Sequence, residues 1–190
     1  MPDGRDLLLN YVRRGDVESF SAFVVLHAGW LKAYLRGLVS SEVEADDAFQ
    51  DVWVKVIKSC GSYRGGSVRA YLTRVARSAV IDRFRRTGQP AVSLDAENDA
   101  GETLGNTLAD AAPTADAAFE TRSTGEDVRR AVRTLPPNQR EVVMMRIEGE
   151  LSFREIAEIL GVPLGTALTW MHVATRRLRE LLGENDEGNG

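Results

Sequence analysis

Arginine is the residue type whose spacing in this sequence most directly suggests a chemistry. Between residues 64 and 86 there are seven arginines and a single acidic residue, Asp82, so this segment has a net charge of +6. The arginines are Arg64, Arg69, Arg74, Arg77, Arg83, Arg85 and Arg86. Guanidinium groups bind phosphates through paired hydrogen bonds, and an ordinary exposed helix mixes charges of both signs. The segment therefore favours a polyanionic partner over a merely solvated surface.

Residue types that support catalysis or metal binding do not form a recognisable set. Cys60 is the single cysteine, and the two histidines, His27 and His172, are far apart in the sequence. We find no Ser-His-Asp set and no metal-ligand spacing, and the "RGG" that ends at Gly66 is too short for a nucleotide-binding loop. We therefore expect no catalytic residue, no metal site and no cofactor, and the protein is predicted not to be an enzyme.

The distribution of charge divides the chain into three parts. The net charge is +4 over residues 1–86, −8 over 87–127 and zero over 128–190. The acidic part is poor in large apolar side chains and cannot bury enough surface to fold alone, and it conceals the basic segment within an overall pI of 5.3. We predict two small domains at 1–90 and 128–184, an acidic linker at 91–127 and a disordered tail at 185–190.

Apolar residues recur with helical periodicity in both predicted domains, and convincing strand alternation is missing. Asp16 can cap the first long helix of the amino-terminal domain. A second helix is expected at about 43–58, with a polar side that carries Asp46, Asp47, Gln50, Asp51 and Lys55. A third helix begins at Val68, and its inward residues are expected to be Tyr71, Leu72, Val75, Ala79 and Ile81. The sequence therefore predicts an all-α protein.

The carboxyl-terminal domain contains the pattern of a helix-turn-helix unit. Ser152 and Glu155 form a capping box that begins a helix ending near Leu160. Gly161 can adopt the positive φ that ends a helix, and Pro163 fits the first turn of the next one. Two helices joined by a short turn with glycine are typical of DNA-binding proteins. The second helix is expected to bury Ala167, Met171, Ala174 and Leu178.

Three stretches, taken in order, resemble the bacterial RNA polymerase sigma factors, specifically the small extracytoplasmic-function group with only regions two and four. The polymerase-docking helix of that family is similar to "DDAFQDVWVKV", and its promoter-melting helix is similar to "YLTRVARSAVIDRFRR". Its minus-thirty-five domain is similar to "LPPNQREVVMMRIEGELSFREIAEILGVPLGT". The three stretches cover more than half of the chain, and an acidic linker separates the last two.

The resemblance implies specific partners for the amino-terminal domain. It implies docking on core RNA polymerase through Asp47, Gln50 and Asp51. It implies binding and melting of promoter DNA at the minus-ten element by Tyr63, Arg64, Arg74, Arg77, Arg83, Arg85 and Arg86. The Tyr63 ring can either stack on an exposed base or pack inside the domain. The linker is either a polyanion mimic that threads the polymerase or a charged tether.

The upstream DNA contacts implied by the resemblance are Thr166, Thr169, His172, Arg176 and Arg177. Relatives commonly carry basic residues where this chain has Leu168, Trp170, Val173 and Thr175. Three explanations remain open. The apolar side chains can read thymine methyl groups, or bind a protein partner such as an anti-sigma factor. We favour the third, in which DNA affinity is weakened and tethering to polymerase compensates for it.

The expected function is to direct core RNA polymerase to specific promoters and to help open them, under the control of an anti-sigma factor. The alternatives are a stand-alone helix-turn-helix regulator and a helical adaptor for another protein. The first residues lack the pattern of a signal peptide, and no apolar run approaches about 18 residues. We therefore expect a cytoplasmic protein without membrane insertion.

Overall fold

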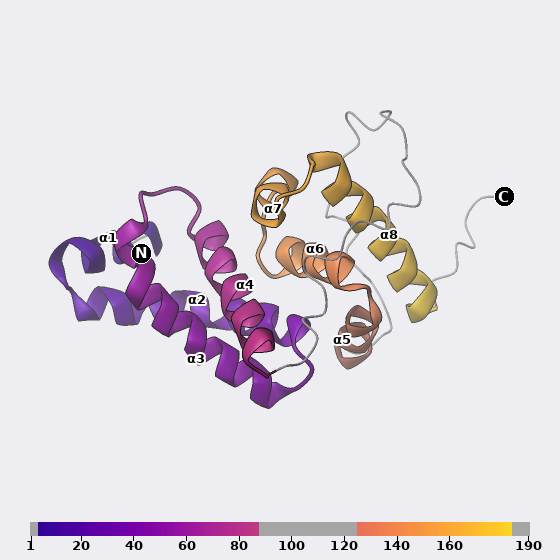
Figure 1. Cartoon of the computed structure of the whole chain (residues 1–190), viewed down its shortest axis with the longest axis horizontal. Coiled ribbons are helices and arrows are strands. Elements are labelled where there is room, and N and C mark those ends of the chain that lie inside the picture. Colours follow the sequence, from indigo (N-terminus) through magenta and orange to yellow (C-terminus); the bar gives the residue numbers. More distant parts are fainter. Residues whose placement is uncertain (1–3, 88–124, 184–190) are drawn as a thin grey trace.

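The amino-terminal domain is a bundle of helices joined by short turns (Figure 1). The structure is a computed structural model, and it describes residues 4–87 and 125–183. The helices of this domain are α1 (Gly4–Arg14), α2 (Val17–Leu38), α3 (Glu42–Ser59) and α4 (Val68–Thr87), with the short 3-10 helix η1 (Cys60–Ser62) after α3. No β-strand occurs in the described ranges, and the all-α prediction is confirmed.

The carboxyl-terminal domain contains four helices among the described residues. They are α5 (Gly125–Thr134), α6 (Pro137–Ile147), α7 (Phe153–Leu160) and α8 (Leu164–Leu182). Helix α5 begins at Gly125, inside the segment predicted to be the linker at 91–127. The rest of that predicted linker and the predicted tail at 185–190 lie outside the described residues.

Local signals set the ends of the helices in the amino-terminal domain. The Asp16 side chain accepts a hydrogen bond from the Glu18 backbone N–H at 3.1 Å, as the capping prediction requires. Ser41 caps α3 in the same way through the backbone N–H of Glu44. Both caps satisfy backbone groups that a helix end leaves unpaired. The interior between α2, α3 and α4 is apolar and includes Phe23, Leu31, Tyr34, Leu35, Ala48, Val52, Val56 and Leu72.

The buried face of α4 differs in part from the prediction. Leu72 and Ala79 are fully buried as predicted, whereas Tyr71, Val75 and Ile81 are only half-buried. The other buried residues are Ala70, Thr73, Ala76, Val80 and Phe84. The reason is that α4 packs not only against α2 and α3 but also against α7 of the other domain. A third neighbour widens the buried stripe beyond what one apolar face indicates.

The helix-turn-helix unit forms as predicted. Ser152 and Glu155 make both hydrogen bonds of the capping box at the start of α7. Gly161 ends α7 in the left-handed conformation with φ +69°, and α8 then leaves at 106° to α7. Ala167, Ala174 and Leu178 are buried, while Met171 is half-buried. These residues hold α8 against α5, α6 and α7.

We expect Gly161→Ala to lower the free energy of unfolding by about 1–2 kcal/mol, because a Cβ is unfavourable in the left-handed conformation. Gly165→Ala is the matched control, since Gly165 lies within α8 with open space around its Cα. The control is expected to be neutral or stabilising, because alanine favours helix. Urea unfolding of the full chain measures both values. Equal midpoints for the two variants would contradict the role assigned to Gly161.

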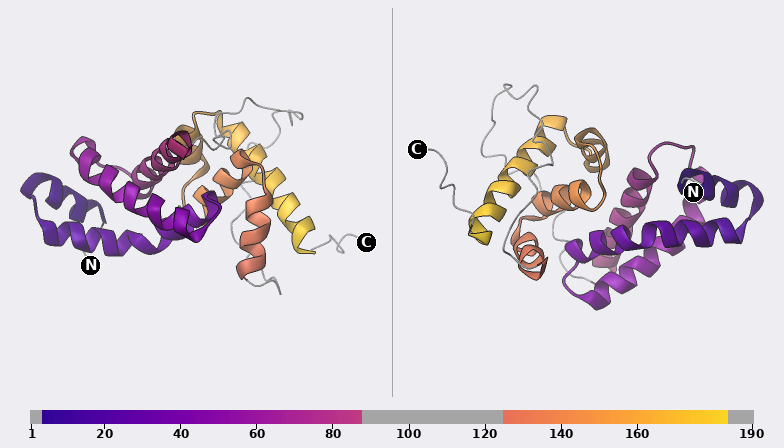
Figure 2. Two further views of the ribbon diagram at one scale, coloured as in Figure 1. Left: turned by 60° about the horizontal axis from the view of Figure 1, so that its bottom comes forward. Right: turned by 180° about the vertical axis from the view of Figure 1, so that it is seen from behind.

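The two domains pack against each other, and both views of Figure 2 show them side by side. Helix α2 contacts α5 and α6, and α4 contacts α7. Gly37 of α2 lies against Met144 of α6, where a side chain at residue 37 would collide with the Met144 thioether. The buried apolar residues of both domains form a single connected core. The basic helix α4 therefore lies partly at an interface within the chain.

Candidate nucleic-acid and polymerase interfaces

Helices α3 and α4 bring two predicted sets of site residues together. An Arg83 Nη2 atom lies 2.6 Å from Asp47 Oδ2, and its Nη1 atom lies 4.0 Å from Asp51 Oδ2. Arg86 Nη2 lies 2.8 Å from the same Asp51 oxygen. The carboxylates predicted to bind polymerase therefore form ion pairs with arginines predicted to bind DNA.

A shallow open pocket lies over these ion pairs. It is lined by Asp47, Gln50, Asp51, Arg83 and Arg86. Gln50 is exposed, and the carboxylate side chains are about one-third to one-half exposed. Because the groups are partly desolvated, their mutual attraction exceeds that of a fully solvated pair. The predicted docking and DNA-binding residues form one mixed-charge surface.

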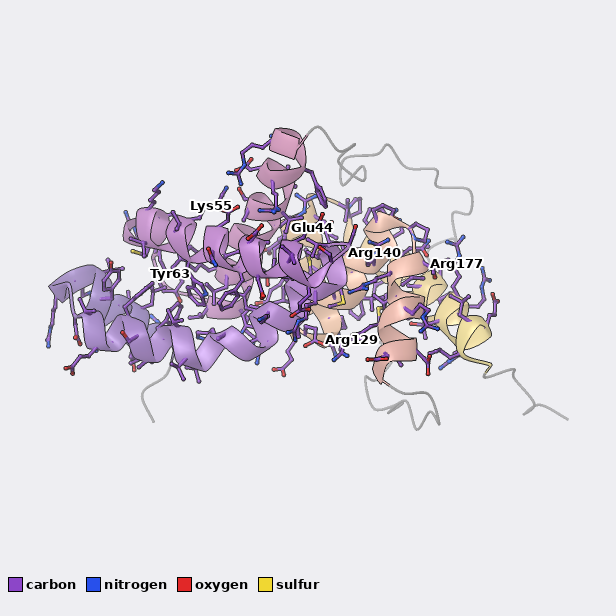
Figure 3. The ribbon with its side chains drawn as sticks, turned by 90° about the horizontal axis from the view of Figure 1, so that it is seen from below. Glu44, Lys55, Tyr63, Arg129, Arg140 and Arg177 are labelled. Atoms are coloured by element: carbon purple, nitrogen blue, oxygen red, sulfur yellow. The ribbon has the colours of Figure 1, made fainter. Side chains whose placement is uncertain are left out.

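A third link between α3 and α4 was not part of the predicted site. The Lys55 ammonium donates to Ser78 Oγ at 2.9 Å and to Asp82 Oδ2 at 2.5 Å (Lys55 is labelled in Figure 3). This ammonium holds the pKa of Asp82 below its ordinary value, mainly through its hydrogen bond to the carboxylate. A lone acidic residue among arginines was the sequence signal for such a pair. Lys55 therefore neutralises the acid that interrupts the basic face.

Two of the predicted DNA-binding arginines contact the carboxyl-terminal domain. Arg77 Nε donates to Glu141 Oε1 of α6 at 2.7 Å, and the Glu141 side chain is 1% exposed. Arg74 Nη2 lies 3.5 Å from Glu158 Oε2 of α7, where both side chains are more than half exposed. Tyr34 is buried next to Arg77 and Glu141, and burial raises the pKa of Tyr34 well above its ordinary value. Arg77 is thus an interface residue in this conformation, which differs from the expectation of a solvent-facing DNA contact.

Two other predicted arginines are exposed. Arg85 is exposed in the last turn of α4, close enough to Asp82 to lower the pKa of that carboxyl. Arg64 is exposed beside η1, where its Nη1 donates to the Gly61 carbonyl at 2.6 Å. These two side chains are accessible to a polyanion without separating the domains.

Tyr63 packs inside the amino-terminal domain rather than presenting an open ring (Figure 3). Its side chain is 6% exposed, and its hydroxyl donates to the Gly66 carbonyl at 2.8 Å. Its ring centroid lies 5.2 Å from that of Tyr71, which is half-buried. The sequence left open whether the Tyr63 ring stacks on a base or packs inside the domain, and in this conformation the ring packs inside the domain. A base can stack on the ring only after the ring leaves this position.

The residues predicted to contact upstream DNA lie along α8 with different exposure. His172, Arg176 and Arg177 are exposed, whereas Thr166 and Thr169 are half-buried. Thr169 Oγ1 donates back to the Gly165 carbonyl at 2.9 Å, and Arg177 Nη1 donates to Gln139 Oε1 at 3.3 Å. Arg177, which Figure 3 labels beside α8, is thus held toward Gln139 of α6.

The apolar residues of α8 are not equivalent. Trp170 is half-buried and packs against the hydrophobic core, so it has a structural role in this conformation. Leu168 and Val173 are half-buried as well. The position of Trp170 is explained by core packing, and its indole carries no positive charge for a phosphate.

Within residues 4–87 and 125–183 no group of three or more histidine, cysteine or acidic residues could hold a metal ion. In the same ranges no single helix is long and apolar enough to cross a membrane, although the bent pair α7 and α8 reaches that length and composition together. Cys60 is a buried free thiol that contacts the Ile57 carbonyl.

A helical domain with a charged α3–α4 surface, joined to a helix-turn-helix domain, defines a class of DNA-binding transcription proteins. Residues 23–89 match Sigma-70 region 2, and residues 125–178 match Sigma-70, region 4. Together the two matches cover more than half of the chain. The chain belongs to the extracytoplasmic-function group of bacterial RNA polymerase sigma factors.

Individual relatives agree with this membership. The chain is 28% identical to the ECF RNA polymerase sigma factor SigE of Mycolicibacterium smegmatis over 88% of its own length, and it spans 63% of that relative. It is 30% identical to the RNA polymerase sigma factor CarQ of Myxococcus xanthus, covering 90% of this chain and 94% of CarQ. The fold is similar to that of the sigma factor RpoE from Bartonella quintana, solved in complex with the anti-sigma factor NepR. The TM-score is 0.66 at 24% identity, over 87% of this chain and 98% of RpoE.

Proposed function

We propose that this sigma factor docks on core RNA polymerase through Asp47, Gln50 and Asp51 and engages the minus-ten element through the arginines of α4. One observation carries the assignment. Asp47 and Asp51 are ion-paired to Arg83 and Arg86 across the α3–α4 groove. A single surface therefore presents the proposed acidic docking groups beside the proposed basic DNA-binding groups. Such an arrangement would hold melted DNA next to the polymerase without any covalent step by the sigma factor.

The chemistry of this proposal is binding rather than catalysis. Separated strands are held by phosphate contacts and by base stacking, and stacking contributes about 1–3 kcal/mol per base. The nucleotidyl transfer belongs to the polymerase, so the sigma factor itself is not an enzyme. It would act in the cytoplasm, where core polymerase and promoter DNA are found.

Helix α8 is proposed to position upstream DNA. The free amides of its first turn favour a phosphate, and Thr166, Thr169, His172, Arg176 and Arg177 line the helix behind it. Few of these side chains are positively charged, so its intrinsic affinity for duplex DNA is proposed to be low. Tethering to polymerase through the amino-terminal domain would raise the effective concentration of α8 at the promoter.

Control by an anti-sigma factor is part of the proposal. The relative RpoE was solved with the anti-sigma factor NepR, and its fold covers most of this chain. A protein of this kind would compete for the same acidic and apolar surfaces that the proposal gives to polymerase.

Promoter-specific transcription with purified core polymerase tests the proposal. The full chain is expected to confer start-site choice on core polymerase and to co-purify with it. Co-purification without start-site choice would favour an adaptor, and DNA binding without polymerase association would favour a stand-alone regulator. Asp47→Ala with Asp51→Ala is expected to reduce co-purification, while the exposed pair Glu126→Ala with Glu180→Ala serves as the matched loss of negative charge.

A further inference from the structure

Three arginines of α4 are occupied by acidic groups of the carboxyl-terminal domain. Arg77 pairs with the buried carboxylate of Glu141, as described above. Arg69 Nη1 donates to the Glu148 carbonyl at 2.9 Å, and its Nη2 lies 3.2 Å from Glu150 Oε2. The contacts to Arg69 and Arg77 leave these side chains about one-third and one-sixth exposed, respectively.

The loop that supplies Glu150 is shaped for this contact. Glu150 adopts φ +52°, which is the left-handed region that disfavours residues with a Cβ. A strained residue persists only where its surroundings stabilise it. Here Glu150 forms an ion pair with Arg69, and the same guanidinium donates a hydrogen bond to the nearby Glu148 carbonyl. The adjacent Trp30 ring also faces Arg69, with 5.0 Å between the guanidinium carbon and the ring centroid. Arg69 is therefore held firmly at the interface.

The third contact lies on the helix-turn-helix unit itself. Arg74 Nη2 is 3.5 Å from Glu158 Oε2 of α7, and α7 leads directly into α8. Figure 1 shows α4 between the rest of its own domain and α6 and α7. The helix proposed for the minus-ten element and the unit proposed for the minus-thirty-five element thus touch. Elements about 25 base pairs apart are separated by roughly 85 Å of straight duplex at about 3.4 Å per pair.

This closed arrangement cannot contact both elements of one straight duplex. It also places carboxylates where α4 would otherwise meet DNA phosphates. Glu150 lies 3.2 Å from Arg69 and Glu158 lies 3.5 Å from Arg74, and all four side chains are partly exposed. Carboxylates and phosphates bind guanidinium groups through the same geometry. The two ligands therefore compete for the same arginines.

We infer that the carboxyl-terminal domain acts as an intramolecular substitute for DNA, and that Glu141, Glu150 and Glu158 hold the free protein in a self-inhibited closed form by occupying Arg77, Arg69 and Arg74. The inference rests on the proposed function in one respect, the assignment of α4 to DNA. Opening exchanges the three intrachain contacts for phosphate contacts. Any partner that separates the domains would expose the basic face of α4.

A disulfide across the interface tests the inference without altering any charged residue. A Cβ at Gly37 would lie 2.8 Å from Cγ of Met144. With a carbon–carbon bond of about 1.5 Å, the Cβ atoms of a cysteine pair at these positions lie at most about 4.3 Å apart, within the usual disulfide range. We expect Gly37→Cys with Met144→Cys to form a bond on oxidation and to fix the closed form. The buried native thiol of Cys60 is remote from solvent.

The oxidised variant is expected to bind a labelled mixed-sequence single-stranded oligonucleotide at least about tenfold more weakly than the reduced variant. Three lost phosphate contacts would reduce the salt slope of log K by about 2, at about 0.7 per contact. Fluorescence anisotropy over a salt series measures both quantities. Gly37→Ser with Met144→Ser is the matched control, because it places side chains of similar size at both positions without a bond. Gly37→Cys alone is unsuitable, since its side chain would collide with Met144. Equal affinity of the oxidised and reduced double variants would overturn the inference.

Charge reversal supplies the opposite test. Glu150→Arg with Glu158→Arg replaces two exposed carboxylates by groups that repel Arg69 and Arg74. Glu126→Arg with Glu180→Arg is the control, because it changes the net charge equally at exposed positions of the same domain. We expect the first pair to bind the oligonucleotide about tenfold more tightly than the control pair. Equal affinities would show that the acidic groups do not mask α4.

The proposed function and the closed form fail in different ways. If the wild-type chain does not direct core polymerase to a promoter, the proposed function fails, and the oligonucleotide measurements still decide whether the arginines are masked. If the wild-type chain directs transcription and the disulfide does not change oligonucleotide affinity, only the proposed self-inhibition fails.

Discussion

Arg85→Ala is expected to reduce promoter opening about tenfold while leaving association with core polymerase unchanged, whereas Arg83→Ala is expected to weaken both. Arg85 is exposed and forms no ion pair with Asp47 or Asp51, so its loss removes a proposed DNA contact without disturbing the proposed docking carboxylates. Arg83 is 23% exposed and lies 2.6 Å from Asp47, so its loss also removes the group that positions this proposed docking carboxylate. A hydrogen bond between charged groups contributes about 1.5–3 kcal/mol, which corresponds to roughly ten- to hundredfold in binding.

Promoter opening and association with core polymerase are measured separately. Fluorescence of a base analogue placed in the minus-ten element reports opening, and anisotropy of the labelled sigma factor with core polymerase reports association. Arg13→Ala, at an exposed arginine in the last turn of α1, controls for loss of one positive charge. If Arg83→Ala and Arg85→Ala lose association equally, the ion pair between α3 and α4 does not position the docking group.

The parts of the fold that sequence reasoning predicted are those encoded within a few residues. The Ser152 capping box, the Asp16 cap and the left-handed Gly161 each depend on local backbone geometry and on neighbouring side chains. Such local interactions are recognisable because the residue types they need are few. The helix-turn-helix unit was predictable for the same reason.

The interface between the domains was not predictable in this way. Arg77 and Glu141 are 64 positions apart, and charge counting treats every arginine of α4 as available. The sequence did contain one signal, because Glu141 precedes the apolar run Val142 to Met145, and a buried carboxylate requires a cationic partner. The apolar run therefore indicates that Glu141 has a cationic partner, but it does not identify which arginine is that partner.

The ion pairs also change how the net charge of α4 is understood. The +6 of residues 64–86 is the charge available to DNA only when the domains are apart and the α3 carboxylates are engaged elsewhere. In the described conformation Arg69, Arg74 and Arg77 face acidic groups of the other domain. A basic segment in the sequence therefore gives an upper limit to the phosphate contacts of the free protein.

Restoring positive charge on α8 is expected to increase its affinity for duplex DNA. Leu168→Arg with Val173→Arg introduces two basic groups at half-buried positions of the helix. Each new phosphate contact steepens the salt slope of log K by about 0.9, so the pair should add about 1.8 and raise affinity roughly 10- to 100-fold at 0.1 M salt. Trp170 is left unchanged, because it packs against the core and its replacement would cost stability.

A salt titration of the full chain with a duplex that carries the upstream element measures this effect. Leu168→Gln with Val173→Gln is the matched control, because it removes the same apolar groups without adding charge. If the arginine pair and the glutamine pair show the same slope, this face of α8 does not meet DNA, and its apolar side chains then belong to a protein contact. If the glutamine pair alone loses promoter preference, Leu168 and Val173 read thymine methyl groups, and the weak electrostatics of α8 are compensated by apolar readout.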